Sequence, residues 1–318
     1  MDYTLLLIVV LLVVIGLVIL YSTSAYNGQV KFHDSFYYLK KQAFATVLGI
    51  VLMLFVAGMD YHIWQRLAVF GYLAAVALSV AVMLFGREIN GSKRWLALGP
   101  FSFQPSEFAK VALILFLADL VTKNVKTIGK MWTLCRIMFW ILPIVGLVGA
   151  SNLSTAIIIL GIGVILIFVA SPKYAQFALM GIAGACFMGI FLALESYRLE
   201  RLAIWRNPEK YEKGYQTLQG LYAIGSGGVF GVGIGNSVQK LGFVPEAQND
   251  MIFSIICEEL GLAGAGIIVF LFLLLIWRFF LIASGSRDLF GALIATGAMA
   301  HMMIQVILNI AVVTNTIP

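Results

Sequence analysis

Charged side chains are scarce along this chain. Only 11% of its 318 residues are Asp, Glu, Lys or Arg, whereas 61% are hydrophobic; a soluble domain carries roughly 25% charged residues. Because this deficit extends over the whole length, it excludes a soluble globular protein. Apolar runs of about 20 residues recur, the length a helix needs to cross a hydrocarbon core of about 30 Å. The composition therefore predicts an all-α, polytopic transmembrane helix bundle that forms a single integral membrane domain over residues 1–318.

Cysteine and histidine are also too few and too dispersed for the sites that they commonly form. The 3 cysteines show no CxxC spacing, and the 3 histidines lie far apart without an HExxH pattern. A disulfide framework and a zinc site are therefore not expected. No GKS or GKT accompanies the alternating glycines Gly231, Gly233 and Gly235, so a nucleotide-binding loop is not expected either. These glycines instead predict a backbone that closely approaches a bulky ligand or another helix.

Nine apolar segments are predicted to span the bilayer. Their approximate ranges are 5–25, 42–58, 67–86, 105–121, 136–151, 154–171, 176–194, 252–281 and 288–312. The first segment follows no basic stretch and lacks a small-residue cleavage site, which favours a retained span over a signal peptide. With the N-terminus inside, the short inner connections are rich in Lys and Arg, in agreement with the positive-inside rule. The odd number of spans and the end at TNTIP lead us to expect that a C-terminal tenth helix is missing.

One long polar interruption, about residues 195–250, separates the seventh and eighth predicted spans. It is predicted to lie outside the membrane and to build a site beside the bilayer. Its basic residues are not needed to orient the chain in the membrane, and we therefore expect them to bind an anionic ligand. Arg198 and Arg201 could bind phosphate through their guanidinium groups, or could belong to a solvated basic patch at the lipid headgroups. Three glutamines offer the uncharged hydrogen-bonding groups that sugars often meet: Gln216, Gln219 and Gln239.

A second informative segment, residues 91–110, precedes and opens the fourth predicted span. Pro105 is suited to the first turn of a helix, and Glu107 and Lys110 then lie three residues apart on one face. An acid and a base within a membrane helix are costly unless paired, so we expect them to pair with each other or to contact a ligand. Arg94 and Trp95, just before the helix, could serve as a phosphate contact and an interfacial aromatic, or as ordinary membrane-interface anchors.

Asp250 stands where the long polar loop meets the eighth predicted span. It could cap that helix, or it could act as a general base whose basicity rises when a bound lipid partly desolvates it. Glu258 and Glu259 follow two turns deeper, and they cannot both face one partner. At least one of them is expected to point into a polar interior, where Lys110 could be its partner.

Three ordered segments of the chain resemble the SEDS family (shape, elongation, division and sporulation), which comprises FtsW, RodA and SpoVE. They are GSKRWLALGPFSFQPSEFAK, the run from YRLERL through GYQTLQ to IGSGGVFGVGIGNSVQK, and VPEAQNDMIFSIICEELG. The resemblance extends from the first span to the terminal NTIP and so covers essentially the whole chain. Within the family, LYSTS, YYLKKQ, KRWLALGPF and NLSTAIII look most like the cell division branch, FtsW.

This resemblance implies ten transmembrane helices, of which about nine are present here, and a large extracellular loop between helices 7 and 8. It implies a peptidoglycan glycosyltransferase that polymerises lipid II together with a class B penicillin-binding protein and other division proteins. Asp250 matches the family's essential aspartate, whereas Asn152 stands where many relatives carry an acid, so we assign that turn no catalytic role. The predicted substrate-binding residues are Arg94, Glu107, Lys110, Arg198, Arg201, Gln216, Gln219, Gln239, Lys240 and Glu246.

The predicted chemistry is a single inverting displacement of undecaprenyl pyrophosphate, with Asp250 deprotonating the 4-hydroxyl of the acceptor sugar. No cofactor is expected to be tightly bound, and no protein-ligated metal, although a divalent cation (Mg or Mn) could assist the pyrophosphate. Two alternatives of other classes remain open: a flippase that transports lipid II, and a non-catalytic scaffold of the division machinery. A flippase should need polar groups through the whole bundle, whereas here they concentrate on one face. The predicted location is the bacterial cytoplasmic membrane, at the division septum.

Overall fold

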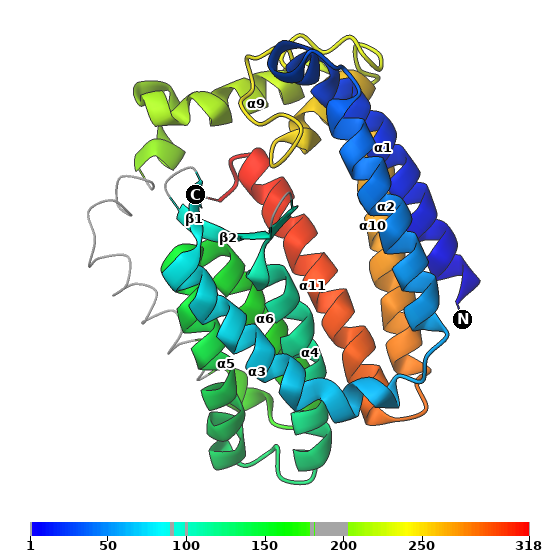
Figure 1. The fold of residues 1–318 in the computed structure, drawn as a ribbon, viewed down its shortest axis with the longest axis vertical. Coiled ribbons are helices and arrows are strands. Elements are labelled where there is room, and N and C mark those ends of the chain that lie inside the picture. The colour runs from blue at the N-terminus through cyan, green and yellow to red at the C-terminus, as the bar shows by residue number, and fades with distance from the viewer. Residues whose placement is uncertain (1, 90–91, 99–100, 179–180, 182–202, 318) are drawn as a thin grey trace. The chain divides into compact units, whose positions relative to one another are not determined.

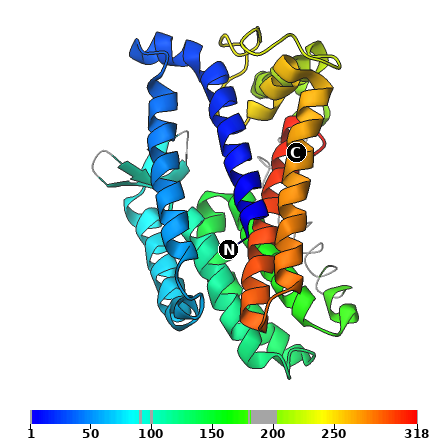
Figure 2. The same cartoon turned by 90° about the vertical axis from the view of Figure 1, so that its right-hand side faces the viewer.

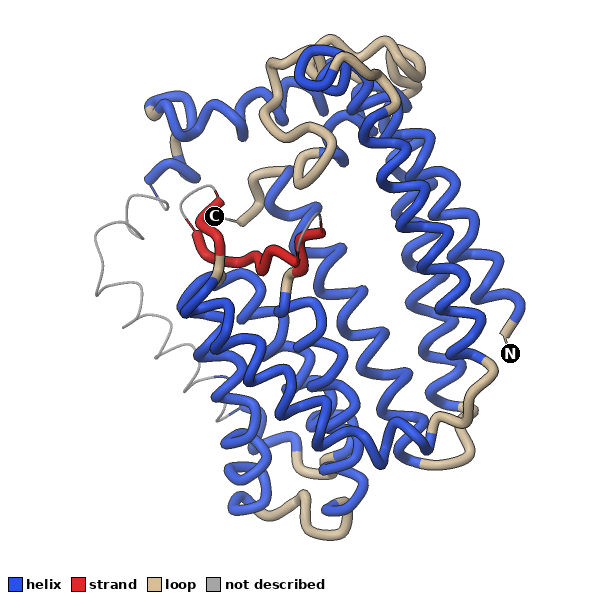
Figure 3. Tube along the Cα trace, viewed as in Figure 1, coloured by secondary structure: helices blue, strands red, loops and turns tan. Residues whose placement is uncertain are grey.

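The structure, a computed structural model, describes residues 2–89, 92–98, 101–178, 181 and 203–317 (Figure 1). Helices account for most of these residues and strands for very few (Figure 3). The long helices are α1 (Tyr3–Phe32), α2 (Tyr37–Ala57), α3 (His62–Phe85), α4 (Pro105–Asn124), α5 (Met131–Ser151), α6 (Leu153–Ala170), α10 (Ile252–Ser284) and α11 (Leu289–Val313). The shorter helix α9 (Tyr215–Ser226) follows two 3₁₀ turns, η1 (Pro208–Lys210) and η2 (Glu212–Gly214).

The predicted helix bundle is confirmed. Each of the long helices corresponds to one predicted span, and seven of the described helices are long and apolar enough to cross a membrane. The predicted span at 176–194 falls largely outside the described residues. Helix α4 carries charges near both ends, Glu107 and Lys110 at the start and Asp119 and Lys123 at the end. Both pairs form ion pairs along the helix, which offsets the cost of charge in an apolar segment.

Helix α1 continues to Phe32, seven residues beyond its predicted end near residue 25. The polar stretch after Leu20 does not end the helix because its side chains find partners. The Thr23 and Ser24 hydroxyls donate to the Leu20 carbonyl at 3.1 and 2.6 Å, an arrangement that bends helices. Figure 2 shows the last turns of α1 turning away from the direction of its first turns.

A small antiparallel sheet was not predicted. Its strands β1 (Arg87–Ile89), β2 (Ser92–Leu98) and β3 (Phe101–Phe103) lie in the order β1-β2-β3 between α3 and α4. Leu96 of β2 pairs with Phe103 of β3. Strands β1 and β3 have only three residues each, too few to show a two-residue alternation in the sequence. Pro100 and Pro105, on either side of β3, indicated only turns. The sheet positions Arg94 and Trp95 on β2.

The chain forms two compact units. The first comprises Met1–Gly58, Ala185–Arg278 and Val306–Pro318, and the second comprises Met59–Gly184 and Phe279–Gln305. In the second unit α3 packs on α4 and α5 packs on α6. In the first unit α1 contacts α2, and Ile19 of α1 belongs to a buried cluster with residues of α10 such as Ile256 and Ile268.

Candidate active site

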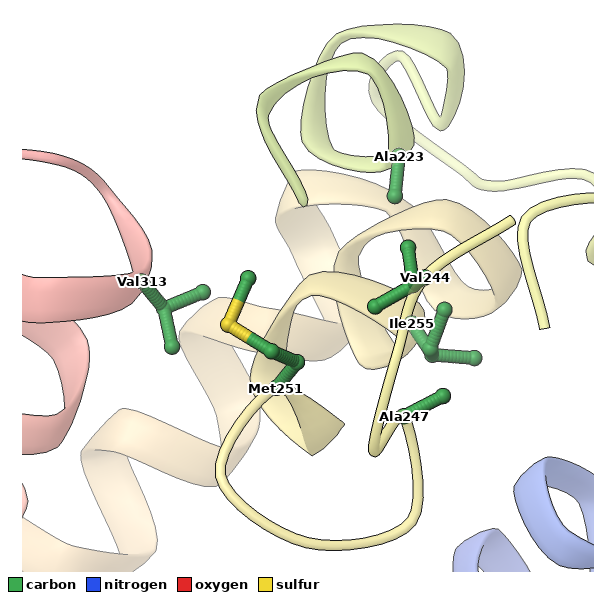
Figure 4. Packing of buried hydrophobic residues seen from close by; sticks show 6 residues of the cluster. All are labelled: Ala223, Val244, Ala247, Met251, Ile255 and Val313. Carbon is green, nitrogen blue, oxygen red and sulfur yellow. The ribbon is translucent and has the colours of Figure 1, made fainter. Parts of the chain in front are cut away.

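Asp250 lies in a loop that a hydrophobic cluster fixes in place. Val244, Ala247 and Met251 of this loop are buried, and they share the cluster with residues of α9, α10 and the end of α11 (Figure 4). The other members are Ala223, Ile255 and Val313. Asp250 itself is exposed, although the next residue is 5% exposed. The buried neighbours therefore hold the backbone while the carboxylate remains open to solvent or to a ligand.

A side chain of α11 also holds the backbone of Asp250. The Asn309 side-chain amide donates a hydrogen bond to the Asp250 carbonyl at 3.1 Å. Over the described ranges, no hydrogen bond or ion pair reaches the Asp250 carboxylate, so it does not cap α10 in this conformation. The loop closes instead through its backbone, with the Ile252 N–H donating to the Asn249 carbonyl at 3.3 Å. The Asp250 carboxylate is therefore available to a ligand.

The two glutamates of α10 bind different parts of the glycine-rich loop. Glu258 accepts hydrogen bonds from the Ser237 hydroxyl at 2.5 Å and from the Val238 N–H at 3.0 Å. Glu259 pairs with the Lys240 ammonium at 2.6 Å and accepts a hydrogen bond from the Ser22 hydroxyl of α1 at 2.7 Å. All of these side chains are buried. This arrangement satisfies both carboxylates, as buried charges require.

The predicted pairing of Lys110 with Glu258 or Glu259 is wrong. The Lys110 ammonium lies 2.7 Å from the Glu107 carboxylate, and it also donates to the Gln305 side chain at 3.4 Å. Glu259 instead forms its ion pair with Lys240, which is only 5% exposed. Lys240 was predicted to bind the substrate, whereas the buried carboxylate that it meets belongs to Glu259, 19 residues further along the chain.

The backbone of the glycine-rich loop runs directly against α10, which confirms the predicted close approach to another helix. The N–H groups of Val232 and Gly233 donate to the Glu258 and Glu259 carbonyls at 2.9 and 3.0 Å. These carbonyls are free because Gly261, with a φ of 68°, interrupts the helix. Gly231 has a φ of 77°, and a Cβ there would lie 2.2 Å from the Glu259 carbonyl oxygen. Only glycine fits at this contact.

The remaining predicted residues of the long loop lie in varied surroundings. The Gln216 side chain is half-buried and donates weakly to the Pro245 carbonyl at 3.5 Å. Gln219, also half-buried, belongs to α9. The side-chain oxygen of Gln239 is buried without a partner among the described residues, and Glu246 is exposed and accepts a hydrogen bond from Asn249. Arg198 and Arg201 lie outside the described residues.

In the second unit, Lys110 is almost completely buried and Glu107 is half-exposed. The exposed fractions of their side chains are 1% and 52%. Arg94 donates to the Ser151 carbonyl at 3.2 Å and lines a cavity of about 10 Å³ beside Asn152, enough for about one water molecule. Asn152 caps α6, because its side chain accepts a hydrogen bond from the Thr155 N–H.

Replacing Lys110 with Ala should lower the thermal stability of the purified protein in detergent. The change leaves the Glu107 carboxylate without its partner at 2.7 Å and opens a cavity where a fully buried side chain lay. Cavity formation alone costs about 2–5 kcal/mol for a side chain of comparable size. Lys126→Ala, just beyond the end of the same helix, is the control, because Lys126 is exposed and forms no ion pair among the described residues. Equal melting temperatures for the two variants would contradict a structural role for Lys110.

Two polar side chains of α11 were missed by sequence reasoning. Gln305 contacts Lys110, and Asn309 contacts the Asp250 backbone. Both are amides within a mostly apolar helix, spaced four residues apart. That pattern was the available signal, because a polar side chain in an apolar helix requires a partner. Within the described ranges, no group of three or more His, Cys, Asp or Glu side chains could hold a metal ion.

Comparison with known proteins agrees with these features. The chain is 38% identical to Stage V sporulation protein E of Bacillus subtilis, over 100% of this chain and 88% of that protein. It is 34% identical to the probable peptidoglycan glycosyltransferase FtsW of Trichlorobacter lovleyi, over 100% of this chain and 85% of that protein.

Solved structures show the same architecture. A chain of a peptidoglycan synthase complex, described for its coordination of polymerization and crosslinking, matches with a TM-score of 0.84 and 28% identity, over 100% of this chain and 88% of that one. The rod shape determining protein RodA of Thermus thermophilus matches with a TM-score of 0.70 and 26% identity, over 98% of this chain and 84% of that one. The family model for FtsW, RodA and SpoVE, described as cell cycle protein, matches residues 3–318. The chain is therefore a multi-pass membrane protein that belongs to the FtsW/RodA/SpoVE family of cell cycle proteins.

Proposed function

We propose that this protein is a peptidoglycan glycosyltransferase that polymerises lipid II into glycan strands at the outer face of the bacterial cytoplasmic membrane. Its relatives named FtsW support the activity, since several of them are probable peptidoglycan glycosyltransferases and this chain covers more than four fifths of their length. The observation that carries the mechanism is the exposed, unpaired carboxylate of Asp250 on a backbone held by Asn309 and by a buried cluster.

The proposed reaction is one displacement at the donor sugar. The Asp250 carboxylate takes the proton of the acceptor's 4-hydroxyl, and the oxygen attacks the anomeric carbon of the donor sugar from the face opposite the diphosphate. The bond between that carbon and the diphosphate oxygen breaks, and undecaprenyl pyrophosphate leaves with the electron pair. A general base of this kind contributes about 10²–10⁴-fold to the rate. Since Asp250 is the proposed base and no second carboxylate serves as nucleophile, the anomeric configuration inverts.

Cationic groups would stabilise the charge that develops on the leaving group. Arg94 and Lys110 of the second unit, together with Arg198 and Arg201, are the proposed contacts to the diphosphate. A divalent cation, Mg or Mn, would enter with the substrate, because such ions commonly bind through substrate phosphates and one or two carboxylates. Lys240 has another role in this structure, since its ammonium already pairs with Glu259.

The sugar-binding residues proposed for the long loop are polar and at least partly accessible. Gln216, Gln219 and Glu246 are half-buried or exposed in the first unit, and they can exchange hydrogen bonds with sugar hydroxyls. Gln239 is half-buried, and we propose that its side-chain oxygen, which has no partner among the described residues, accepts a hydrogen bond from a sugar once the substrate is bound. In the second unit, Glu107 is the residue proposed to contact the sugar, because its side chain is half-exposed beside Lys110.

A class B penicillin-binding protein is the proposed partner. The structurally similar chain comes from a peptidoglycan synthase complex in which polymerization and crosslinking are coordinated. A partner that cross-links the new strands would account for the need to form such a complex. The proposed location is the division septum, together with other division proteins, as in the cell division branch of the family.

The decisive experiment supplies labelled lipid II to the purified protein and its penicillin-binding partner. We expect a ladder of glycan strands on a denaturing gel. A parallel measurement follows translocation of a fluorescent lipid II across the bilayer of sealed vesicles that contain the protein. Translocation without any polymer would favour the flippase alternative, and the absence of both activities would favour a scaffold.

A further inference from the structure

Two reciprocal hydrogen bonds tie the end of α11 to the long loop. The Trp205 indole N–H donates to the Asn315 carbonyl at 2.9 Å, and the Asn315 side-chain amide donates to the Trp205 carbonyl at 3.1 Å. Each residue is therefore both a donor and an acceptor toward the other, and both belong to the first unit. We call this pair of contacts the clamp. Neither residue has a role in the proposed reaction.

The backbone of Asn315 has a conformation that ends helices. Its φ is 54°, in the left-handed region that asparagine adopts more readily than most residues. The N–H groups of Thr316 and Ile317 donate to the Ala311 carbonyl at 2.8 and 3.3 Å, and such bonds close the last turn of a helix around a left-handed residue. From this turn, both the carbonyl and the side-chain amide of Asn315 reach Trp205.

The same end of α11 contacts the loop that carries the proposed base. The Asn309 side chain donates to the Asp250 carbonyl at 3.1 Å. Val313, which is 1% exposed, packs in the buried cluster that includes Met251 (Figure 4). Asn315 lies about 9 Å beyond Asn309 at a helical rise of 1.5 Å per residue. The clamp is therefore within about two helical turns of both contacts.

A helix end that is not held by other contacts is a poor support for a catalytic group. The terminal turns of helices open at a free-energy cost near zero, so an unclamped α11 would let Asn309 and Val313 shift. A general base must lie within hydrogen-bond reach of the proton that it takes. A misplacement of about 1 Å can lower a rate by about 10²-fold.

We infer that Trp205 and Asn315 are positioning residues for Asp250. Their clamp fixes the last turns of α11, and Asn309 and Val313 in those turns hold the backbone that carries the carboxylate. The inference rests on the proposed function, because it concerns the geometry of the proposed base. It gives neither residue of the clamp a contact with the substrate.

The first test compares Asn315→Gly with a matched control, His33→Gly. Glycine adopts a positive φ without strain, so Asn315→Gly keeps the turn and the bond from the indole and removes only the amide donor. His33 ends α1 with nearly the same conformation, at a φ of 55°. Its side chain is exposed and forms no hydrogen bond or ion pair among the described residues.

The second test removes the other hydrogen bond. Trp205→Phe deletes the indole N–H but keeps an aromatic ring and the backbone carbonyl that Asn315 contacts. Trp132→Phe is its control, because Trp132 is 80% exposed. The two variants of the clamp remove different hydrogen bonds, so either one alone tests the inference.

Initial rates of polymer formation at several concentrations of labelled lipid II give kcat and KM. For both variants of the clamp we expect kcat to fall by about tenfold, because the base is displaced by a fraction of an ångström. We expect KM to stay unchanged, because the clamp does not contact the substrate. The two controls should keep both constants.

Hydrogen exchange, followed by mass spectrometry, measures the same effect without substrate. In the loop of Asp250 the Val244 and Asn249 N–H groups donate to carbonyls of the same loop at 2.9 Å. Amides of residues 244–252 should exchange on the order of tenfold faster in Asn315→Gly, since its loop opens more often. They should exchange at the unmodified rate in His33→Gly.

A double variant tests the route from the clamp to the base. Asn309→Ala breaks the contact to the Asp250 carbonyl directly. If the clamp acts through Asn309, the loss in kcat for Asn309→Ala with Asn315→Gly should be smaller than the product of the two single losses. Two fully independent losses would contradict this route.

Three results would overturn the inference. They are an unchanged kcat and exchange rate in both variants of the clamp, an equal loss in His33→Gly, and a raised KM with an unchanged kcat. The last result would place the clamp at the substrate. If the unmodified protein forms no polymer, the proposed function fails, and the exchange rates still show whether the clamp fixes the loop of Asp250.

Discussion

Asp250→Asn should abolish strand formation while leaving the protein folded. The amide cannot take a proton from the acceptor hydroxyl, so the loss should reach about 10²–10⁴-fold, the usual contribution of a general base. The fold should survive because the Asp250 side chain is exposed and the Asn309 contact is to its backbone carbonyl. The measurement is the initial rate of polymer formation from labelled lipid II, with the melting temperature recorded in parallel.

The control for this variant is Glu209→Gln, which removes an exposed carboxylate of the 3₁₀ turn η1 in the same unit. It should polymerise at the unmodified rate. Asp250→Glu should keep part of the activity, because it retains a base in a displaced position. Polymer formation by Asp250→Asn at the rate of the control would remove this carboxylate from the mechanism.

Glu259→Ala should be strongly destabilising, as should Lys240→Ala. The two side chains are 3% and 7% exposed, and their charged atoms lie 2.6 Å apart. Removing one leaves the other charge buried and uncompensated, at a cost of about 3–5 kcal/mol. For a chain of this size we expect the melting temperature to fall by on the order of 10 °C. Thermal unfolding in detergent, followed by intrinsic fluorescence, measures this change.

The double variant Lys240→Met with Glu259→Leu tests whether the two side chains stabilise the fold as a pair or contribute to its stability separately. An apolar replacement of both partners is often nearly neutral, so the double variant should be more stable than either alanine variant. The exposed pair of Lys40 and Asp34 supplies the control, since Lys40→Ala should cost at most about 1 kcal/mol. Unchanged stability of Lys240→Ala, together with weaker lipid II binding, would instead place Lys240 at the substrate.

Most of the fold could be predicted because hydropathy determines where helices can cross a bilayer. The prediction of helix ends was wrong where a helix continues through polar residues. The end of α1 was placed near residue 25, because the residues after Leu20 are increasingly polar. In the structure Ser22, Thr23 and Ser24 are buried, and their hydroxyls bond to Glu259 or to the Leu20 carbonyl. Such partners depend on distant segments and cannot be identified from local composition.

The candidate site was predictable in part. Asp250 stood out because it ends a polar loop at the start of an apolar helix, and the pairing of Glu107 with Lys110 followed from their spacing. The partners of Glu258 and Glu259 did not follow, because the glycine-rich loop folds back on α10 through close backbone contacts that Gly231 and Gly261 permit. Glycine residues in the sequence indicate that the backbone approaches another segment closely, but they do not indicate which segment that is.

The bend of α1 has a consequence for how this helix meets the membrane. A straight helix of 30 residues would be about 45 Å long, well beyond a hydrocarbon thickness of about 30 Å. The part before the bend, from Tyr3 to Leu20, rises only about 27 Å. The bend therefore shortens the part of α1 that has to match the hydrocarbon core, so the full length of 30 residues does not require the helix to tilt.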